Sequence, residues 1–299
     1  MQAVGQWLLS LLVASSVVFV SPMALACAVC AAADPTINAP GAEQPFQRRL
    51  RISLELMSGN VREGTPDARI LSLTDQRVAA TVSYAPVRDV LLSLVVPVLH
   101  RDLSGAGEQQ TIWTLGDLDL RAYGVAWRDV SSWRRSFGLF GGLKTPTAPL
   151  ENDSRGIPLP AELQPGCSSL VPYLGASYSL GRGIWSGQLS AALYLPFSVR
   201  SAPHPGYSMR AVSWLQMQPV HALATRVGLT ARADASGELS PGVADLNSGG
   251  VIGYVTTDVL VSPTADLVLS LGALFPAAQA LLGEHREGTI LSARVGYDF

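Results

Sequence analysis

The chain has 299 residues, of which 48% are hydrophobic and only 15% are charged, and its formal net charge is −2. This hydrophobicity excludes an intrinsically disordered chain, and the charge balance lacks the basic excess of a nucleic-acid-binding protein. Arginine supplies nearly all of the positive charge, with Lys144 the only lysine, which we attribute to the base composition of the genome.

Residues 1–26 have the pattern of a secretory signal peptide. An apolar run from Trp7 to Val20 leads to Ala24-Leu25-Ala26, the small-x-small pattern before a cleavage site. No Lys or Arg precedes the run, so a membrane anchor is the alternative, but the run is short for a span of about 20 residues. We predict cleavage after Ala26. No later stretch resembles a transmembrane helix, which leaves a soluble β-protein or a membrane barrel.

Residues 27–46 predict an extended periplasmic tail that begins with Cys27 and Cys30 in a C-x-x-C motif. A disulfide, lipidation of Cys27, and a metal or redox site are the alternatives. Haem attachment needs a histidine after the second cysteine, where Ala31 stands, and no histidine lies nearby to complete a zinc site. Ala24 is a poor match to a lipoprotein signal. A structural disulfide or unreactive thiols is the interpretation that we prefer.

From residue 47 onward the chain repeats a period-two pattern that predicts β-strands. In segment 49–57, for example, four aliphatic residues alternate with Arg49, Arg51, Ser53 and Glu55. Each segment is roughly ten residues long, the length that a tilted membrane strand needs. We predict about twelve strands, at 49–57, 78–84, 90–99, 115–127, 137–145, 170–180, 185–195, 209–218, 225–234, 251–261, 267–275 and 289–299.

The predicted connections alternate between short turns and long polar loops. An antiparallel barrel with both termini in the periplasm has short turns on that side and longer loops outside, whereas the loops of a soluble sandwich need not alternate. The sequence therefore predicts an all-β protein, a transmembrane antiparallel β-barrel over residues 47–299, in the bacterial outer membrane. The expected turns are 86–89, 128–135, 181–183, 219–220 and 263–265, and the expected loops are 58–75, 101–112, 147–169, 197–208, 235–249 and 277–288.

The last predicted strand ends in an aromatic residue, with Tyr297 two positions before Phe299. This ending resembles the closing strand of outer-membrane barrels, whose carboxy terminus is the signal for the barrel-assembly machinery. Other aromatic residues near strand ends, such as Tyr84, Trp127 and Trp185, are expected at the membrane interfaces.

Charged residues fall on the face of the strands opposite the aliphatic rows. An Arg or Lys that faced lipid near the midplane would cost about 2–4 kcal/mol, so these residues are expected to line the lumen and shape its selectivity. Because both signs occur, a narrow ion-paired interior and a wide channel both remain open. The predicted lumen residues are Arg49, Arg51, Glu55, Asp117, Asp119, Arg121, Lys144, Arg226, Arg232, Asp234, Asp258 and Arg294.

Three short segments resemble the outer-membrane transporter family of the meta-cleavage phenol-degradation pathway. Residues 115–118 with Leu120 are similar to its GDL strand. Residues 142–147 are similar to its GLKLPTG segment, with Thr145 in place of an aliphatic residue. Residues 163–166 are similar to its LQPGTGS loop, although Cys167 and Ser168 replace the Thr-Gly pair. The resemblance implies an outer-membrane barrel that passes small hydrophobic compounds, and it carries over no catalytic residue.

An enzyme built on the rim of the barrel is the rival class of function. Of the four histidines, His100, His204 and His285 are expected beside outer loops and His221 near a periplasmic turn, and none has the His-x-Ser spacing of barrel lipases. We therefore predict solvated surface histidines, no catalysis and no cofactor. The predicted function is passive transport of a small solute, with loop 147–169 able to fold inward or to serve as a binding surface. The alternative is a closed barrel that binds or anchors something.

Overall fold

The computed structural model describes residues 48–63, 71–105, 108–153, 155–156, 159, 163–199, 205–240, 243–245, 248–283 and 285–299. The predicted signal peptide, the tail with Cys27 and Cys30, and His204 lie outside these residues. Within the described ranges, no helix long and apolar enough to cross a membrane is present.

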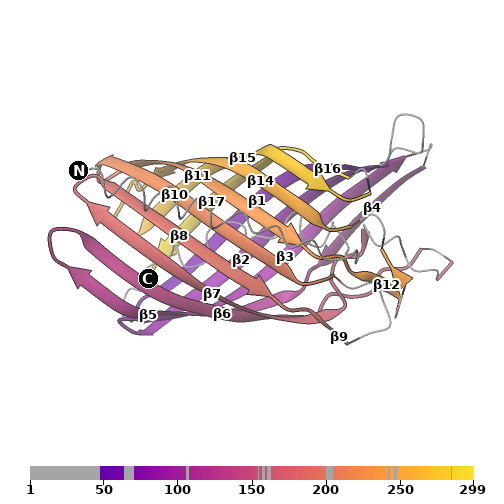
Figure 1. The fold of residues 1–299 in the computed structure, drawn as a ribbon, viewed down its shortest axis with the longest axis horizontal. Coiled ribbons are helices and arrows are strands. Elements are labelled where there is room, and N and C mark those ends of the chain that lie inside the picture. The colour runs from indigo at the N-terminus through magenta and orange to yellow at the C-terminus, as the bar shows by residue number, and fades with distance from the viewer. Residues whose placement is uncertain are drawn as a thin grey trace, which may run out of the picture.

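Twelve long antiparallel strands form one sheet that closes on itself (Figure 1). Each strand pairs with the next along the chain, and the last pairs with the first. The backbone N–H of Phe299 donates to the carbonyl of Leu50 (2.8 Å) at this seam. Closure leaves no open edge, as a sheet in lipid requires. The strands are β1 (Leu50–Glu63), β2 (Leu71–Val87), β3 (Val90–Gly105), β5 (Leu118–Val130), β6 (Arg134–Thr145), β7 (Ser169–Arg182), β8 (Trp185–Tyr194), β10 (Ser208–Val220), β11 (Leu223–Asp234), β14 (Gly250–Val261), β15 (Leu267–Leu281) and β17 (Ile290–Asp298).

Five short strands extend or decorate this wall at the loop end. In Figure 1, β4, β12 and β16 gather at the right-hand end, whereas the carboxy terminus lies toward the left. β4 continues the line of β5 beside β3, β16 continues that of β17 beside β1, and β9 pairs with β7. Their bounds are β4 (Glu108–Leu115), β9 (Phe197–Ser198), β12 (Glu238–Ser240), β13 (Val243–Ala244) and β16 (Arg286–Glu287).

All twelve predicted strands are confirmed, but several predicted ends are wrong. β1 and β2 extend into the segment expected as loop 58–75, β3 and β4 form a hairpin within 101–112, and β15 continues to Leu281. Only residues 131–133 separate β5 from β6. The strands continue above the membrane, where both of their faces can be polar. The alternation of apolar and polar residues therefore no longer identifies the strand in the sequence.

The outer face carries the apolar belt that a membrane barrel needs. Aromatic residues cluster at the turn end, where Tyr297 packs edge-on against Phe299 with ring centroids 4.7 Å apart. The predicted interface residues Tyr84, Trp127 and Trp185 are all exposed on this face. The exposed aliphatic residues of the belt include Leu50, Ile52, Leu54, Leu56, Val78, Val82, Leu92, Leu94, Leu120, Leu139, Leu174, Leu189, Leu215, Val227, Leu229, Val259, Leu269, Leu271, Leu291 and Val295.

The inner face is less uniformly polar than predicted, because apolar clusters occupy the half of the lumen nearer the loops. Glycines on neighbouring strands make room for some of the rings: a β-carbon on Gly142 would collide with the Tyr173 hydroxyl, and one on Gly175 with the Phe140 ring. Three clusters are buried inside the wall: Val61, Leu73, Leu103 and Leu163; Met57, Ile252, Tyr254, Leu274 and Ile290; and Phe140, Val171, Tyr173, Ala192 and Tyr194.

Candidate functional site: the barrel lumen

A cavity of about 580 Å³ occupies the half of the lumen nearer the short turns. Its lining comes from most strands of the barrel and contains more arginines than carboxylates. Besides Tyr123, the titratable residues that line it are Arg51, Arg128, Asp129, Arg134, Arg135, His221, Arg226, Asp258 and Arg294.

Arg51 lies at the seam of the barrel. It forms a bidentate ion pair with Asp298 of the neighbouring strand β17, through Nε–Oδ1 (2.6 Å) and Nη2–Oδ2 (2.7 Å). The two residues are direct register partners. Bidentate arginine–carboxylate pairs are among the stronger hydrogen-bonded pairs, so this one locks the first strand to the last.

Arg226 lies against the inner wall of β10. Its guanidinium stacks over the Trp214 ring, 4.4 Å from the ring centroid. Its Nη2 donates to Oε1 of Gln216 (3.0 Å), the register partner of Arg226 on β10. The cation–π contact and this hydrogen bond hold the positive charge at the cavity wall.

Asp258 is the register partner of Arg226 on its other side, on β14. Its carboxylate lies over Gly272 of β15, on the side away from Arg226. The position is so close that a β-carbon on Gly272 would collide with Asp258 Oδ1. Arg294 on β17 also lines the cavity, and its Nη2 donates to the Ser53 hydroxyl (3.4 Å). Opposite it in register stands the predicted lumen residue Glu55.

A second charged group lies midway along the lumen. Asp119 is buried and accepts from Arg121 Nη2 (2.7 Å) and from the Tyr173 hydroxyl (2.9 Å). Tyr173 stacks on Tyr194, with ring centroids 4.6 Å apart. Lys144 is the register partner of Asp119 on β6. These groups satisfy one another, as buried charges must.

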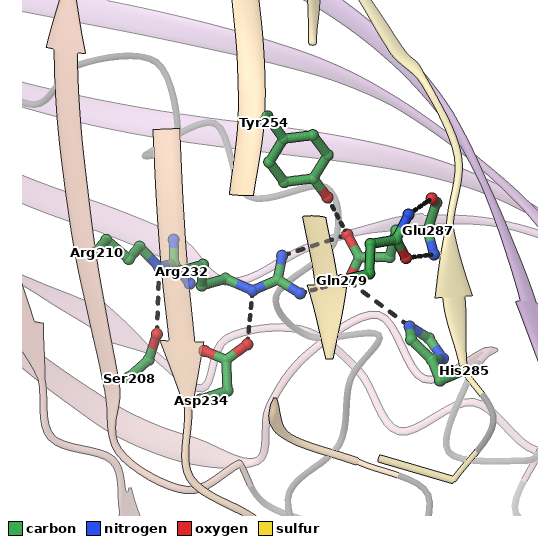
Figure 2. A network of polar contacts seen from close by, with 8 residues as sticks. All are labelled: Ser208, Arg210, Arg232, Asp234, Tyr254, Gln279, His285 and Glu287. Atoms are coloured by element: carbon green, nitrogen blue, oxygen red, sulfur yellow. Dashed lines mark hydrogen bonds and ion pairs between the residues drawn. The ribbon is translucent and has the colours of Figure 1, made fainter. Parts of the chain in front are cut away.

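The outer half of the lumen contains a larger buried network (Figure 2). Arg232 of β11 binds Asp234 (Nε–Oδ2 2.6 Å) and the carboxylate of Glu287, which also accepts from the Tyr254 hydroxyl. The backbone N–H of Glu287 donates to Gln279 Oε1 (3.0 Å). Side chains from β11, β14 and the segment that contains β16 therefore meet at one carboxylate.

Glu287 lies on β16, beyond the strands that cross the membrane. Burial would raise the pKa of Glu287, but the Arg232 guanidinium, the His285 imidazole and the Tyr254 hydroxyl together lower it to about 2. His285 itself is buried, with Nε2 3.6 Å from Glu287 Oε1. The prediction that His285 is a solvated surface residue is therefore wrong, because its loop folds against the wall of the barrel.

The segment between β6 and β7 folds into the barrel. Leu163 is fully buried against Val61, Leu73 and Leu103, which lie on the inner faces of β1, β2 and β3. The carbonyl of the next residue, Gln164, accepts from Arg101 Nη1 (2.6 Å). Of the two alternatives predicted for loop 147–169, folding inward and serving as a binding surface, the described part takes the first.

Asp117 pins this inward segment at both ends. It accepts the backbone N–H of Ala148 (3.0 Å) through Oδ1 and that of Cys167 (2.9 Å) through Oδ2. Asp117 lies in the break between β4 and β5, where the Gly116 N–H donates to the Pro97 carbonyl (2.9 Å). Asp117 was predicted to be a selectivity charge, but here its carboxylate anchors the loop.

The other described histidines lie at the ends of the barrel. The His100 ring stacks on the exposed Trp113 (centroids 4.3 Å apart), and its nitrogens face Gln76 Oε1 (3.3 Å) and Asp102 Oδ2 (3.7 Å). Neither partner is a serine, threonine or cysteine side chain. His221 lies in the exposed turn between β10 and β11.

The predicted lumen residues thus occupy three different environments. Arg51, Arg226, Asp258 and Arg294 line the cavity, whereas Arg49 lies at the exposed rim, bound to Asp266 (2.9 Å). The remaining described ones belong to the groups above. Sequence reasoning missed the buried pair formed by Arg101 and Asp75 (3.2 Å), and it also missed Glu287, because all three lie in or beside segments expected to be loops. The interior position of Trp214 was also missed.

No protein-family model matches the sequence, and no curated protein does either. Among solved structures, the chain is similar to the COG4313 outer membrane channel from Pseudomonas putida F1. The TM-score is 0.69 and the sequence identity 16%, over 87% of this chain and 99% of that one. The translocator domain of the autotransporter NalP from Neisseria meningitidis has a TM-score of 0.47 at 10% identity, over 87% of this chain and 90% of that one. A FadL homologue from Pseudomonas aeruginosa scores 0.38 at 9% identity, over 84% and 90%.

The first of these similarities confirms the predicted fold class, a twelve-stranded outer-membrane β-barrel. The protein is therefore a barrel of the bacterial outer membrane, in agreement with the apolar belt on its outer face.

Proposed function

We propose that the chain is a passive outer-membrane channel for a small solute. The observation that carries this proposal is the cavity of about 580 Å³ inside the closed wall, lined by charged and polar side chains. Charged side chains inside a membrane barrel are stable only in contact with polar groups, such as water or a polar solute. The cavity therefore indicates a path that water or a solute occupies.

We propose that the inward loop narrows this path. Leu163 and Gln164 lie in the lumen beside β1, β2 and β3, on the outer side of the cavity. A solute from outside must pass this segment before it reaches the charged half. We propose that displacement of the loop opens the outer mouth.

Selectivity is assigned to the residues that face the cavity without a bidentate ion pair: Arg226, Asp258 and Arg294. Arg51 also lines the cavity, but Asp298 compensates its charge. Opposite charges compensate each other in the pairs Asp119–Arg121 and Arg232–Glu287. These pairs stabilise the barrel wall, and we do not assign solute selectivity to them. The similar channel from Pseudomonas putida F1 supports a transport role by its name, and the short-segment resemblance suggests small hydrophobic compounds. The charged lining favours a solute with a polar or charged group.

A closed barrel that binds or anchors a partner is the second candidate. It is favoured by the three buried clusters, which fill the outer half of the lumen. In this case the tail with Cys27 and Cys30, held by a disulfide or by lipid, would bind or anchor the partner.

Single-channel recording distinguishes these two functions. The mature chain, from Cys27 onward, is refolded in detergent, checked for a heat-modifiable gel shift, and inserted into a planar bilayer. A channel gives reproducible current steps whose ion preference changes when Arg226 is replaced by glutamine. A folded barrel that never conducts would contradict the channel and support the closed barrel. The exposed, rim-bound Arg49→Gln serves as the control for the loss of one positive charge.

We also propose that Tyr297 and Phe299 form the signal read by the barrel-assembly machinery. Both are exposed at the turn end of the closing strand, where a partner in the periplasm can reach them.

A further inference from the structure

Three buried N–H donors in the wall of the cavity have no acceptor among the described residues. They are Gln188 Nε2, Trp214 Nε1 and Arg226 Nε. All three residues line the cavity. A buried donor without an acceptor costs about 1–3 kcal/mol, and three in one place indicate a site built for a group that accepts hydrogen bonds.

The three donors lie next to one another on adjacent strands. Gln188 of β8 and Trp214 of β10 are direct register partners, and the Arg226 guanidinium of β11 stacks on the Trp214 ring. Register partners on one face of a sheet have β-carbons about 4.5–5.5 Å apart, so one small group can contact all three.

The surrounding charge favours an anion. No ion pair joins Arg226 to Asp258, whose carboxylate lies over Gly272 on the other side of β14. Toward the turns, the exposed Arg134 and Arg135 have no ion-pair partner within the described part of the chain. Positive charge therefore leads from the periplasmic mouth to the three donors, an arrangement that raises the local concentration of anions.

We propose that this row of donors is a binding site for a small organic carboxylate, which deepens the proposed channel function by giving the class of its solute. The carboxylate oxygens accept from Trp214 Nε1, Arg226 Nε and Gln188 Nε2. The guanidinium turns off the indole ring to meet them. The apolar part of the solute packs against Leu260 and Val268, which line the same cavity.

The test uses hexanoate, with the uncharged hexanamide as its matched control, on the refolded mature chain in detergent. Binding is measured by calorimetry and by tryptophan emission. The contribution of Trp214 is the part of the emission change that is absent in Trp214→Phe, and it changes when the stacked guanidinium leaves its ring. We expect hexanoate to bind at least tenfold more tightly than hexanamide. Trp214→Phe, which keeps the ring and removes the N–H, weakens hexanoate binding about tenfold or more, as the loss of a hydrogen bond to a charged group predicts.

Three further variants sharpen the assignment. Arg226→Lys keeps the charge but loses the Nε donor, and it weakens binding as Trp214→Phe does. Asp258→Asn removes a carboxylate that competes with hexanoate for the positive charge of Arg226, and it therefore tightens hexanoate binding. Trp185→Phe, on the exposed outer face, leaves the affinity unchanged. A gel shift on heating confirms that each variant is folded.

Equal binding of hexanoate and hexanamide, or wild-type affinity in both Trp214→Phe and Arg226→Lys, would overturn the site. Current steps recorded in parallel keep this result separate from the proposed function. A barrel that conducts without binding hexanoate refutes the carboxylate site alone, whereas one that binds hexanoate without conducting refutes the channel alone.

Discussion

Replacement of Asp117 by alanine should release the loop that narrows the outer half of the lumen. The carboxylate accepts two backbone N–H groups, from Ala148 at 3.0 Å and from Cys167 at 2.9 Å, one at each end of the inward segment. A hydrogen bond to a charged group contributes about 1.5–3 kcal/mol. Water replaces part of this in the variant, so we expect a net loss of about 2–3 kcal/mol of loop docking.

That loss corresponds to a roughly 30- to 150-fold rise in the ratio of undocked to docked loop. The other anchors, Leu163 in its cluster and the bond from Arg101 to the Gln164 carbonyl (2.6 Å), remain in the variant. The loop should therefore leave the lumen more often while the wall stays closed. In single-channel recordings, Asp117→Ala should show a larger conductance level, or longer dwell times in it, than the wild type.

The control is Asp153→Ala, which removes one negative charge from the loop itself. Asp153 accepts the backbone N–H of Arg155 (2.8 Å), two residues further on in the same loop. Currents that are identical in the wild type and in Asp117→Ala, with both barrels folded, would refute the role of this carboxylate as a loop anchor. A change of equal size in Asp153→Ala would show that charge alone is responsible.

Three further predictions concern the wall and its assembly. Because the pKa of Glu287 is lowered from 4.5 to about 2, its ion pair contributes stability above about pH 4.5 that is lost as the pH falls toward 2. Glu287→Gln should therefore destabilise the barrel by about 3–5 kcal/mol at neutral pH in urea titrations, and this difference should shrink with acid; a pH-independent difference would contradict the assignment. Gly142→Ala places a methyl group where a tyrosine hydroxyl lies and should cost about 1–3 kcal/mol in the same assay, whereas Gly253→Ala, with open space at that position, should not; equal losses would count against the packing argument. Phe299→Ala should lower the yield of barrel assembled in cells but not of barrel refolded in detergent, and the outward-facing Phe275→Ala should change neither; a normal cellular yield would remove Phe299 from the assembly signal.

The alternation of the sequence was sufficient to predict the wall of the barrel. Side chains at successive positions of a strand point to opposite faces, so the aliphatic row from Leu50 to Leu56 marks the lipid side without any knowledge of the neighbouring strands. Lipid requires apolar side chains on that whole face, so most of the strands could be recognised one by one, whereas segment 90–99 is apolar on both faces and is less diagnostic. The same reasoning failed above the membrane, as at Arg101, because lipid no longer contacts the outer face there.

The grouping of the inward side chains depends on the tertiary structure. Arg232 meets Glu287 across 55 positions of sequence, and Arg101 meets the carbonyl of Gln164 across 63. An inward charge can line a cavity, form an ion pair or anchor a loop. Which of these it does depends on the strand register and on where the loops fold, and the alternation of residues along one strand predicts neither. The sequence by itself therefore determined which residues face inward. Only the closed barrel decided which of those residues meet, since its curvature and register bring distant strands together.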